Sequence, residues 1–235
     1  MSSNLPDKKS LLGIIGGMGT QATACFYEKL HMLQNVSCEQ DYHDVLLYSI
    51  PSVPDRTAYI IGESSDSPLD YLLHAARTLE AAGVSCIAIP CVTSHYFFSD
   101  ISGAVDVPVL NLLDETVNST LERNVKNVCL FATSGTIKSE ILHNAFSKSG
   151  INISTPSNSV QADLMELIYD MKRGSEVHAG TLELITEKAL EDGAEAVVYG
   201  CTELCIDAPH SPRVINTLDA LAESTLKMLS GGRFS

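Results

Sequence analysis

The sequence predicts an α/β fold that is built from two copies of one strand-and-helix unit. Two short apolar runs rich in Val and Ile each lead into a cysteine, Cys91 in the first case and Cys201 in the second, 110 positions apart. Each cysteine comes eight residues after a glycine, Gly83 or Gly193, that closes a helical pattern. Such runs, preceded by helices and followed by polar residues, are typical of parallel strands. Ligands bind at the carboxyl ends of such strands, so two equivalent cysteines are expected to face one crevice.

The starts of the two units repeat as well. Gly19-Thr20 follows the first apolar run of the chain, and Gly135-Thr136 follows a similar run 116 positions later. The offsets of 116 and 110 positions are close, and both features recur in the same order. A tandem duplication of an α/β unit explains this pattern most simply.

Apolar periodicity, glycines and prolines place the individual elements. In the first unit we expect strands at 11–15, at 45–50, before Cys91 and at 107–110, helices at 20–33, 67–83 and from 93 or 94, and a loop at 51–57. After a linking helix at 113–121, we expect strands from 128, at 197–199 and at 214–215, and helices at 158–171, 175–190 and 218–229. We expect the last of these helices to pack back on the first half.

Composition excludes several classes of function. A chain of 235 residues with 45% hydrophobic residues can form one large domain or two smaller ones with ample cores. The net charge of −14, from 29 acidic and 15 basic residues, argues against nucleic acid or an anionic membrane as a partner. An anionic substrate would therefore need its own local cations. No run of 18 apolar residues is present, so we expect no membrane span.

Seven cysteines occur without a C-x-x-C pair or zinc-type spacing, at positions 25, 38, 86, 91, 129, 201 and 205. Reduced thiols of this kind are typical of a cytoplasmic protein. The apolar run near the start is interrupted by glycines, so we expect no signal sequence there. We interpret the cysteines other than Cys91 and Cys201 as inert core residues.

The glycine-rich turn has three interpretations. Gly17-Met18-Gly19 with Ala22 fits a relaxed dinucleotide-binding pattern, but the strand at 45–50 ends without the acidic residue that would hold a ribose. A nicotinamide oxidoreductase is therefore a weak alternative. The turn is otherwise a tight bend that needs small residues, or a backbone N–H cradle for a substrate carboxylate at a helix N-terminus.

Cys91 and Cys201 are the candidate catalytic groups. A helix N-terminus and hydroxyl donors favour the thiolate, and Thr93 and Thr202 are expected to be such donors. Two thiols on opposite faces of one carbon, one ionised and one protonated, form a base and an acid. This arrangement inverts a stereocentre.

Five short motifs in this order resemble one family. They are Gly-Gly-Met-Gly at 16–19, Pro-Asp-Arg-Thr at 54–57, Pro-Cys-x-Thr-x-His at 90–95, Ala-Thr-x-Gly-Thr at 132–136 and Gly-Cys-Thr-Glu at 200–203. Over residues 11 to about 229 the chain resembles the aspartate/glutamate racemases, specifically the aspartate racemase branch.

The resemblance implies two similar Rossmann-like domains, each with a doubly wound and mainly parallel sheet, related by pseudo-two-fold symmetry. We expect residues 1–112 with 216–235 to form one domain and 113–215 the other, with the active site between them. It also implies a homodimer, no pyridoxal phosphate or other cofactor, no metal, and Cys91 and Cys201 as the two bases. The substrate-binding residues that we expect are Gly17, Met18, Gly19, Arg56, Thr93, Thr133, Thr136, Thr202, Glu203 and either Lys172 or Arg173.

The sequence departs from the family after the first cysteine. Asparagine is usual there and touches the substrate, whereas this chain has Val92, and Ser94 stands where alanine is common. A polar substrate group that loses its partner costs about 1–3 kcal/mol if it is buried. His95 is expected to tune the thiol or bind a carboxylate, or else to cap and pack at the helix start. Glu203 is expected to orient a substrate ammonium, or else to stabilise a helix start.

We therefore predict a cofactor-independent amino-acid racemase, most consistent with aspartate racemase, that acts on a small acidic amino acid. Two alternatives remain open: an isomerase or decarboxylase of a small dicarboxylate on the same fold, and a catalytically silent protein that binds an acidic metabolite. Unequal effects of replacing the two cysteines favour the former. Binding of aspartate without hydrogen exchange favours the latter.

Overall fold

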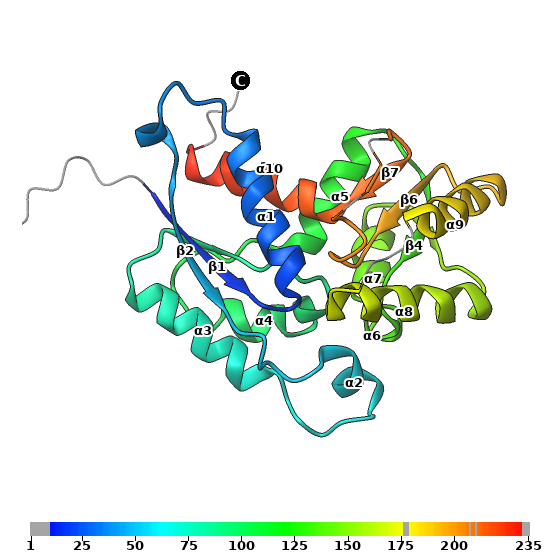
Figure 1. Ribbon diagram of the computed structural model, residues 1–235, viewed down its shortest axis with the longest axis horizontal. Coiled ribbons are helices and arrows are strands. Elements are labelled where there is room, and N and C mark those ends of the chain that lie inside the picture. The colour runs from blue at the N-terminus through cyan, green and yellow to red at the C-terminus, as the bar shows by residue number, and fades with distance from the viewer. Residues whose placement is uncertain (1–9, 176–178, 207, 210, 232–235) are drawn as a thin grey trace, which may run out of the picture.

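Two parallel β-sheets, each flanked by helices, make up the molecule (Figure 1). The structure is a computed structural model that describes residues 10–175, 179–206, 208–209 and 211–231. The first half of the chain lies on the left of Figure 1 and most of the second half on the right. The predicted α/β class with two similar halves is confirmed.

The first sheet has the order β2-β1-β3 and is parallel throughout. Its strands are β1 (Leu11–Gly16), β2 (Asp44–Ser49) and β3 (Cys86–Ala88). Its helices include α1 (Thr20–Leu33), whose bounds are those predicted, and α3 (Leu69–Ala81), which packs against β1 and β2. After α3 the chain turns at Gly83, where φ is 84°.

The second sheet has the order β5-β4-β6-β7 and is also parallel. Its strands are β4 (Asn127–Phe131), β5 (Asn152–Ser154), β6 (Ala196–Tyr199) and β7 (Val214–Asn216). The helices of this half are α6 (Ser134–Lys138), α7 (Ile141–Lys148), α8 (Asn158–Arg173) and α9 (Ala179–Glu191). Residues 176–178 of the helix predicted at 175–190 lie outside the described residues.

Strand register confirms the duplication. Leu12 on β1 is opposite Cys86 on β3, and Val128 on β4 is opposite Ala196 on β6. The first members of these pairs are 116 positions apart and the second members 110, which are the two offsets found in the sequence. The two sheets therefore repeat the same pairing, residue by residue.

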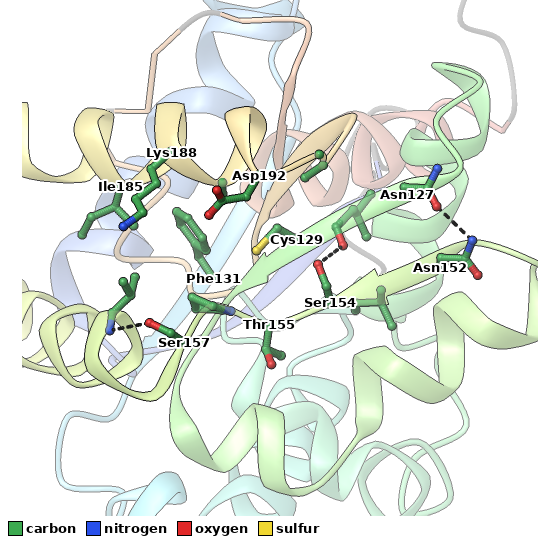
Figure 2. A pocket seen from close by; sticks show the side chains of 17 residues that line it. Asn127, Cys129, Phe131, Asn152, Ser154, Thr155, Ser157, Ile185, Lys188 and Asp192 are labelled. Atoms are coloured by element: carbon green, nitrogen blue, oxygen red, sulfur yellow. Dashed lines mark hydrogen bonds between the residues drawn. The ribbon is translucent and has the colours of Figure 1, made fainter.

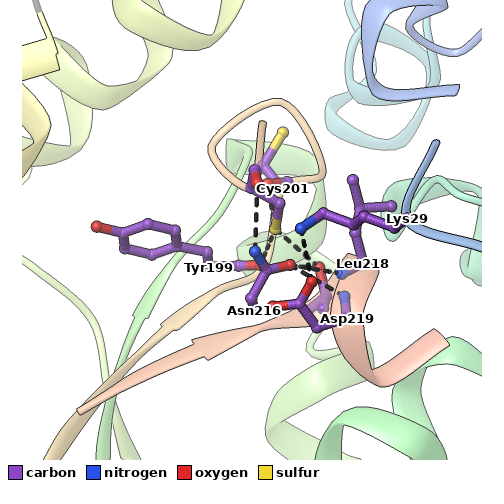
Figure 3. A network of polar contacts seen from close by, with 8 residues as sticks. Lys29, Tyr199, Cys201, Asn216, Leu218 and Asp219 are labelled. Carbon is purple, nitrogen blue, oxygen red and sulfur yellow. Dashed lines mark hydrogen bonds and ion pairs between the residues drawn. The ribbon is translucent and has the colours of Figure 1, made fainter. Parts of the chain in front are cut away.

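The last helix joins the two halves. α10 (Thr217–Leu229) packs against α1 and against α5 (Leu112–Glu122), as expected for a helix that returns to the first half. Lys29 on α1 and Asp219 on α10 form an ion pair of 2.6 Å (Figure 3). One apolar cluster runs from Leu12 and Phe26 in the first half to Leu218 and the core of the second. The boundaries between the two domains stay a prediction.

Two predicted elements differ from the structure. The loop expected at 51–57 ends early, because α2 (Arg56–Ile61) begins inside it and the Asp55 carboxylate accepts a hydrogen bond from the Ala58 N–H at 2.9 Å. The strand expected at 107–110 is reduced to one bridge between Val109 and Ile87.

The helix predicted from 93 or 94 is present as a 3₁₀ turn at Thr93–Phe97 that continues into α4 (Phe98–Ser102). Short elements that were not predicted are the 3₁₀ turn at Glu39–Asp41, α6, α7 and β5. Among the described helices, none is both long enough and apolar enough to cross a membrane.

Gly17 offers a test of the turn that follows β1. Its φ is +93°, and an added Cβ would lie 2.5 Å from the backbone nitrogen of Ile50. Gly62 has a similar φ of +85° with no atom within 4 Å of such a Cβ. We expect Gly62→Ala to lower the free energy of unfolding by about 1–2 kcal/mol through backbone strain alone. Gly17→Ala should cost more, because the chain at Ile50 must also move.

Urea unfolding of the two variants measures this difference. Equal losses of stability would contradict the close approach of the turn to β2.

Candidate active site

Cys91 lies just beyond β3 and ahead of a 3₁₀ turn, with only 5% of its surface exposed. The Ser94 hydroxyl donates toward its Sγ at 3.1 Å and also lies 3.3 Å from the sulfur of Met18. Neither contact uses Thr93, which we had expected to be the donor. The Cys91 sulfur is therefore a hydrogen-bond acceptor.

Cys201 occupies the equivalent position after β6 and is equally buried. Its Sγ donates to Oε2 of Glu203 at 2.9 Å, and Oε1 of the same carboxylate accepts the Gly19 N–H at 3.0 Å. Burial and then the charge of Glu203 raise the pKa of Cys201 well above its ordinary value, although Lys172 opposes them. Cys201 is therefore a protonated thiol, a proton donor held to the glycine turn of the opposite half by one carboxylate.

Lys172, near the end of α8, supplies positive charge to the site. Burial alone would lower its pKa, but Glu203 and Cys201, with a weaker contribution from Cys91, outweigh this effect and raise it. The Lys172 ammonium is therefore held in its charged form beside both thiols. It lies 5.5 Å from the centre of the Tyr169 ring.

Arg173 does not share this position. Its side chain is 63% exposed and pairs with Asp170 on the surface. Of the two basic residues that the sequence left open, the structure places Lys172 beside the thiols and Arg173 away from them.

Arg56 is buried at the start of α2, with 8% of its surface exposed. Its Nη1 donates to the carbonyls of Val53 and Pro54 at 3.2 and 3.1 Å. Its buried Nε has no hydrogen-bond partner among the residues that the structure describes. A buried cation with an unused donor is suited to bind an anion, because an unpaired buried charge is costly.

Asp55 and Tyr169 connect α2 to α8. The Tyr169 hydroxyl donates to Oδ2 of Asp55 at 3.1 Å. Burial would raise the pKa of Asp55, but the Ala58 N–H, Lys172 and Arg56 together lower it. Asp55 is therefore a carboxylate that fixes the loop before Arg56 against the helix that carries Lys172.

Three threonine hydroxyls form a buried cluster between the halves. Thr93 lies 3.0 Å from both Thr133 and Thr136, and these two lie 3.1 Å from each other. Thr202 does not reach a thiol either, since its hydroxyl lies 3.5 Å from Oε2 of Glu203. The prediction that Thr93 and Thr202 donate to the two sulfurs is therefore wrong, because Thr93 is occupied across the interface and Ser94 takes its place.

Backbone N–H groups of the glycine turn already have hydrogen-bond partners within the protein. The Gly17 N–H donates to the Thr23 hydroxyl at 2.9 Å, and the Gly19 N–H is bound to Glu203. Of the three backbone donors expected to cradle a carboxylate, those of Gly17 and Gly19 are thus already engaged. The turn positions Glu203 instead.

His95 fastens the Cys91 loop rather than tuning the thiol. Its Nδ1 lies 2.9 Å from the Cys91 carbonyl, and its Nε2 accepts the Leu112 N–H at 3.1 Å, which makes Nδ1 the protonated nitrogen. Burial lowers the pKa of His95. The histidine is therefore neutral and links the loop to the start of α5.

Cys205 lies in the equivalent place in the second half. It lies 110 positions after His95, and its Sγ is 3.6 Å from the Cys201 carbonyl and 3.4 Å from the Thr217 hydroxyl. Burial raises the pKa of Cys205 to about 11, so it is a structural thiol. Each half thus holds the carbonyl of its cysteine by a side chain four residues later.

Val92 packs into the larger apolar cluster with 2% of its surface exposed. Its departure from the family pattern is therefore accommodated by the core.

A parallel α/β fold with titratable groups gathered at the carboxyl ends of its strands defines an enzyme of the acid–base class. The family model for Asp/Glu/Hydantoin racemase matches residues 15–225. The chain belongs to this family, and the resemblance read from its motifs is confirmed. It is an isomerase of the racemase type.

Individual relatives agree with this assignment. The broad specificity amino-acid racemase RacX of Bacillus subtilis (strain 168) is 27% identical over 230 residues, which cover 92% of this chain and 96% of that protein. Picrophilus torridus aspartate racemase superimposes with a TM-score of 0.85 and 28% identity over 94% of each chain. An aspartate racemase homologue from Pyrococcus horikoshii OT3 shares the fold, with a TM-score of 0.75, 24% identity and coverage of 95% and 99%.

Sequence reasoning missed the partners of the two sulfurs. Ser94 was noted only as a departure from alanine, and no role was expected for Asp55. The spacing of Ser94, three residues after Cys91 at a helix start, was the available signal, because residues three apart share one face of a helical turn. Glu203 was considered as a ligand for a substrate ammonium, and the structure shows it bound to Cys201 and Gly19.

His95 gives a pH-dependent prediction. His95→Asn leaves the Leu112 N–H without its acceptor, so the free energy of unfolding should fall by about 1–3 kcal/mol at pH 7.5. Because the folded-state pKa of His95 is lowered, its contribution is full above the unfolded value of about 6.5 and is lost as the pH falls below it.

The difference in the free energy of unfolding between wild type and His95→Asn, measured by urea unfolding, should therefore be smaller at pH 5.5 than at pH 7.5. His74→Asn, at an exposed site on α3, is the control. A gap that widens at the lower pH would rule out the neutral, buried state of His95.

Proposed function

We propose that the chain is a cofactor-independent amino-acid racemase that transfers protons through Cys91 and Cys201. The observation that carries the proposal is that the two sulfurs have opposite roles in their hydrogen bonds. Cys91 accepts a hydrogen bond from Ser94, whereas Cys201 donates one to Glu203. One sulfur thus has the hydrogen-bonding role of a base and the other that of an acid, at equivalent ends of two related halves.

In this mechanism one thiolate removes the α-proton and leaves a carbanion that is stabilised as an ene-diolate of the carboxylate. The opposite thiol then delivers its proton to the other face of the carbon, and the configuration is inverted. The two sulfurs have exchanged roles at the end, so the reverse reaction follows the same path. Cations beside the carboxylate stabilise the charge that develops on it.

The substrate that we favour is aspartate. A dicarboxylate needs two local cations in a chain of net charge −14, and the site contains two, Arg56 and Lys172. Arg56, with its unused Nε, is proposed to bind one carboxylate, and Lys172 the other. The threonine cluster is proposed to lie at the wall of the site, and Glu203 to position Cys201. The proposal includes the homodimer and the cytoplasmic location that the resemblance implies, and no nucleic-acid or membrane partner.

A broader substrate range is the second candidate. It is favoured by the similarity along almost the whole chain to a racemase named for broad specificity. A panel of amino acids, scored for loss of optical rotation and for deuterium uptake at Cα in D₂O, separates the two. Exchange confined to aspartate and glutamate supports the narrow range. Exchange without inversion, or decarboxylation, would favour the other chemistries on this fold.

Replacement of either cysteine tests the two-base chemistry. We expect Cys91→Ala and Cys201→Ala each to reduce racemisation of aspartate by about 10²–10⁴-fold, the usual contribution of a positioned acid or base. Polarimetry with L- and D-aspartate measures the rates. Cys38→Ala is the control and should keep full activity. Cys38 was expected in the core, but its thiol is exposed, because it lies in the loop before the 3₁₀ turn at 39–41. An active Cys91→Ala enzyme would end the proposal.

Replacing Glu203 and replacing Lys172 should shift the pH profile of activity in opposite directions, because the two residues have opposite effects on the pKa of Cys201. The charge of Glu203 helps to raise the pKa of Cys201, so Glu203→Gln should move the alkaline limb of kcat/KM to lower pH. Lys172 lowers the pKa of Cys201, so Lys172→Met should move the same limb to higher pH. The pH profile of kcat/KM with D- and L-aspartate measures both shifts.

Glu223→Gln, at an exposed position on α10, is the matched control for the loss of one negative charge. Shifts of the same sign in Glu203→Gln and Lys172→Met would show that Cys201 is not the group that titrates.

A further inference from the structure

The two halves differ at one place where a helix covers a sheet. Both ends of α9 lie 110 positions after the ends of α3, so the helices are equivalent. In the first half the chain packs tightly on β1 at Gly13. A Cβ added to Gly13 would lie 3.1–3.2 Å from the side chains of Leu79, on α3, and Val84, which follows the Gly83 turn. The sheet has no free space there.

In the second half the same positions hold Cys129, Ala189 and Ala194. The large side chains of Leu79 and Val84 are thus replaced by methyl groups. A cavity of about 430 Å³ lies between β4, α8 and α9 at this point (Figure 2). We call it the α9 cavity; the residues that matter below are Phe131, Ile153, Val160, Ile185, Lys188 and Asp192, and all of them line it.

The lining combines an apolar floor with two opposite charges. Phe131 and Ile153 come from the sheet and Ile185 from α9. Lys188 and Asp192 are exposed, one helical turn apart, and Figure 2 shows both projecting from the end of α9 at the cavity. The equivalent residues at the end of α3 are Thr78 and Ala82, the residue just after the helix, so the charges belong to this half alone.

In the described parts of the chain, no side-chain hydrogen bond or ion pair joins Lys188 or Asp192 to each other or to another residue. Burial raises the pKa of Cys129 in the cavity wall, and the charge of Asp192 does help to raise it. A lysine that precedes an aspartate by four residues is also the less favourable order for an ion pair on a helix.

We propose that the α9 cavity is a regulatory site for a small zwitterion with an aliphatic side chain, that is, an apolar α-amino acid. Its ammonium would bind Asp192, its carboxylate Lys188, and its side chain the floor of Phe131, Ile153 and Ile185. The volume lies within the range of about 300–1,000 Å³ that is typical of small-molecule sites.

Two elements connect the cavity to the thiols. Val160 in the first turn of α8 lines the cavity, while the last turn of the same helix carries Lys172. The ring of Phe131 stacks on Tyr199 at 6.2 Å, and the Tyr199 hydroxyl lies 2.8 Å from that of Thr186 on α9. Tyr199 precedes the Cys201 loop by one residue, so occupancy of the cavity acts on both sides of the site. This regulatory role rests on the proposed racemase function.

Binding of L-leucine to the full chain, measured by calorimetry, tests the site itself. We expect saturable binding that Lys188→Gln and Asp192→Asn each weaken about tenfold or more, since each removes a charged hydrogen bond. 4-Methylpentanoate and 3-methylbutylamine, which each lack one charge of leucine, should bind as weakly. Glu187→Gln, at an exposed position on α9 that does not line the cavity, is the matched control.

A second variant closes the cavity with the residues of the first half. Ala189→Leu combined with Ala194→Val should abolish leucine binding while the protein keeps a cooperative unfolding transition. Arg56→Gln, which alters the catalytic site, should leave leucine binding unchanged. The reverse pattern, with binding lost in Arg56→Gln and kept in the filled variant, would place leucine in the catalytic site and overturn the proposal. No binding at millimolar leucine would overturn it as well.

The regulatory role has its own readout. Saturating L-leucine should change KM for aspartate at least twofold in the wild type and not in the filled variant. An unchanged KM and kcat in the presence of bound leucine would overturn the regulatory role. If the chain racemises no amino acid, the calorimetric result still decides whether the cavity is a binding site.

Discussion

The carbonyl group of each candidate catalytic cysteine lies against a side chain four residues later, and this contact holds the loop that carries the thiol. His95 binds the carbonyl of Cys91 and the first turn of α5, and Cys205 lies against the carbonyl of Cys201 and the first turn of α10. The two side chains differ in chemistry but occupy equivalent positions. The loop after each strand is thus fixed to a helix start.

The contacts between the halves complete the site. Glu203 spans from the thiol of the second half to the glycine turn of the first, and three threonine hydroxyls satisfy one another across the same interface. Burial makes these polar contacts strong, because an unpaired polar group would be costly there. Burial also raises the pKa of Cys201, which keeps this thiol protonated beside Glu203.

The duplication was predictable from the sequence because it leaves its mark on spacing. Offsets of 116 and 110 positions recur in the strand register, and the bounds of α1 were correct because a glycine turn and a continuous apolar pattern define it. The segment before Arg56 was read as loop from its prolines, although an aspartate cap starts a helix there. A strand at 107–110 was expected from apolar residues that in fact make one bridge.

Site residues that belong to a sequence motif could be predicted, but the hydrogen-bond partners that depend on side-chain packing could not. The two cysteines follow equivalent strands, β3 and β6, as the spacing predicts, but the donors to the sulfurs depend on which hydroxyl is already engaged. The Thr93 hydroxyl contacts Thr133 and Thr136, so Ser94 is the residue that donates to Cys91, and sequence spacing does not distinguish the two hydroxyls. Likewise, the α9 cavity over β4 exists because Ala189 and Ala194 stand where the first half has Leu79 and Val84. This difference is visible only once the register of the strands shows which positions are equivalent.

The position of α10 has a consequence for biosynthesis. Residues 217–229 are made late, yet they cover α1, whose residues are made early, and the ion pair of Lys29 with Asp219 ties the two together. A nascent chain that lacks this segment leaves the apolar face of α1 open to solvent. We therefore expect the amino-terminal half to mature only after residues 217–229 emerge from the ribosome, so that the two halves complete their folding together rather than in order of synthesis.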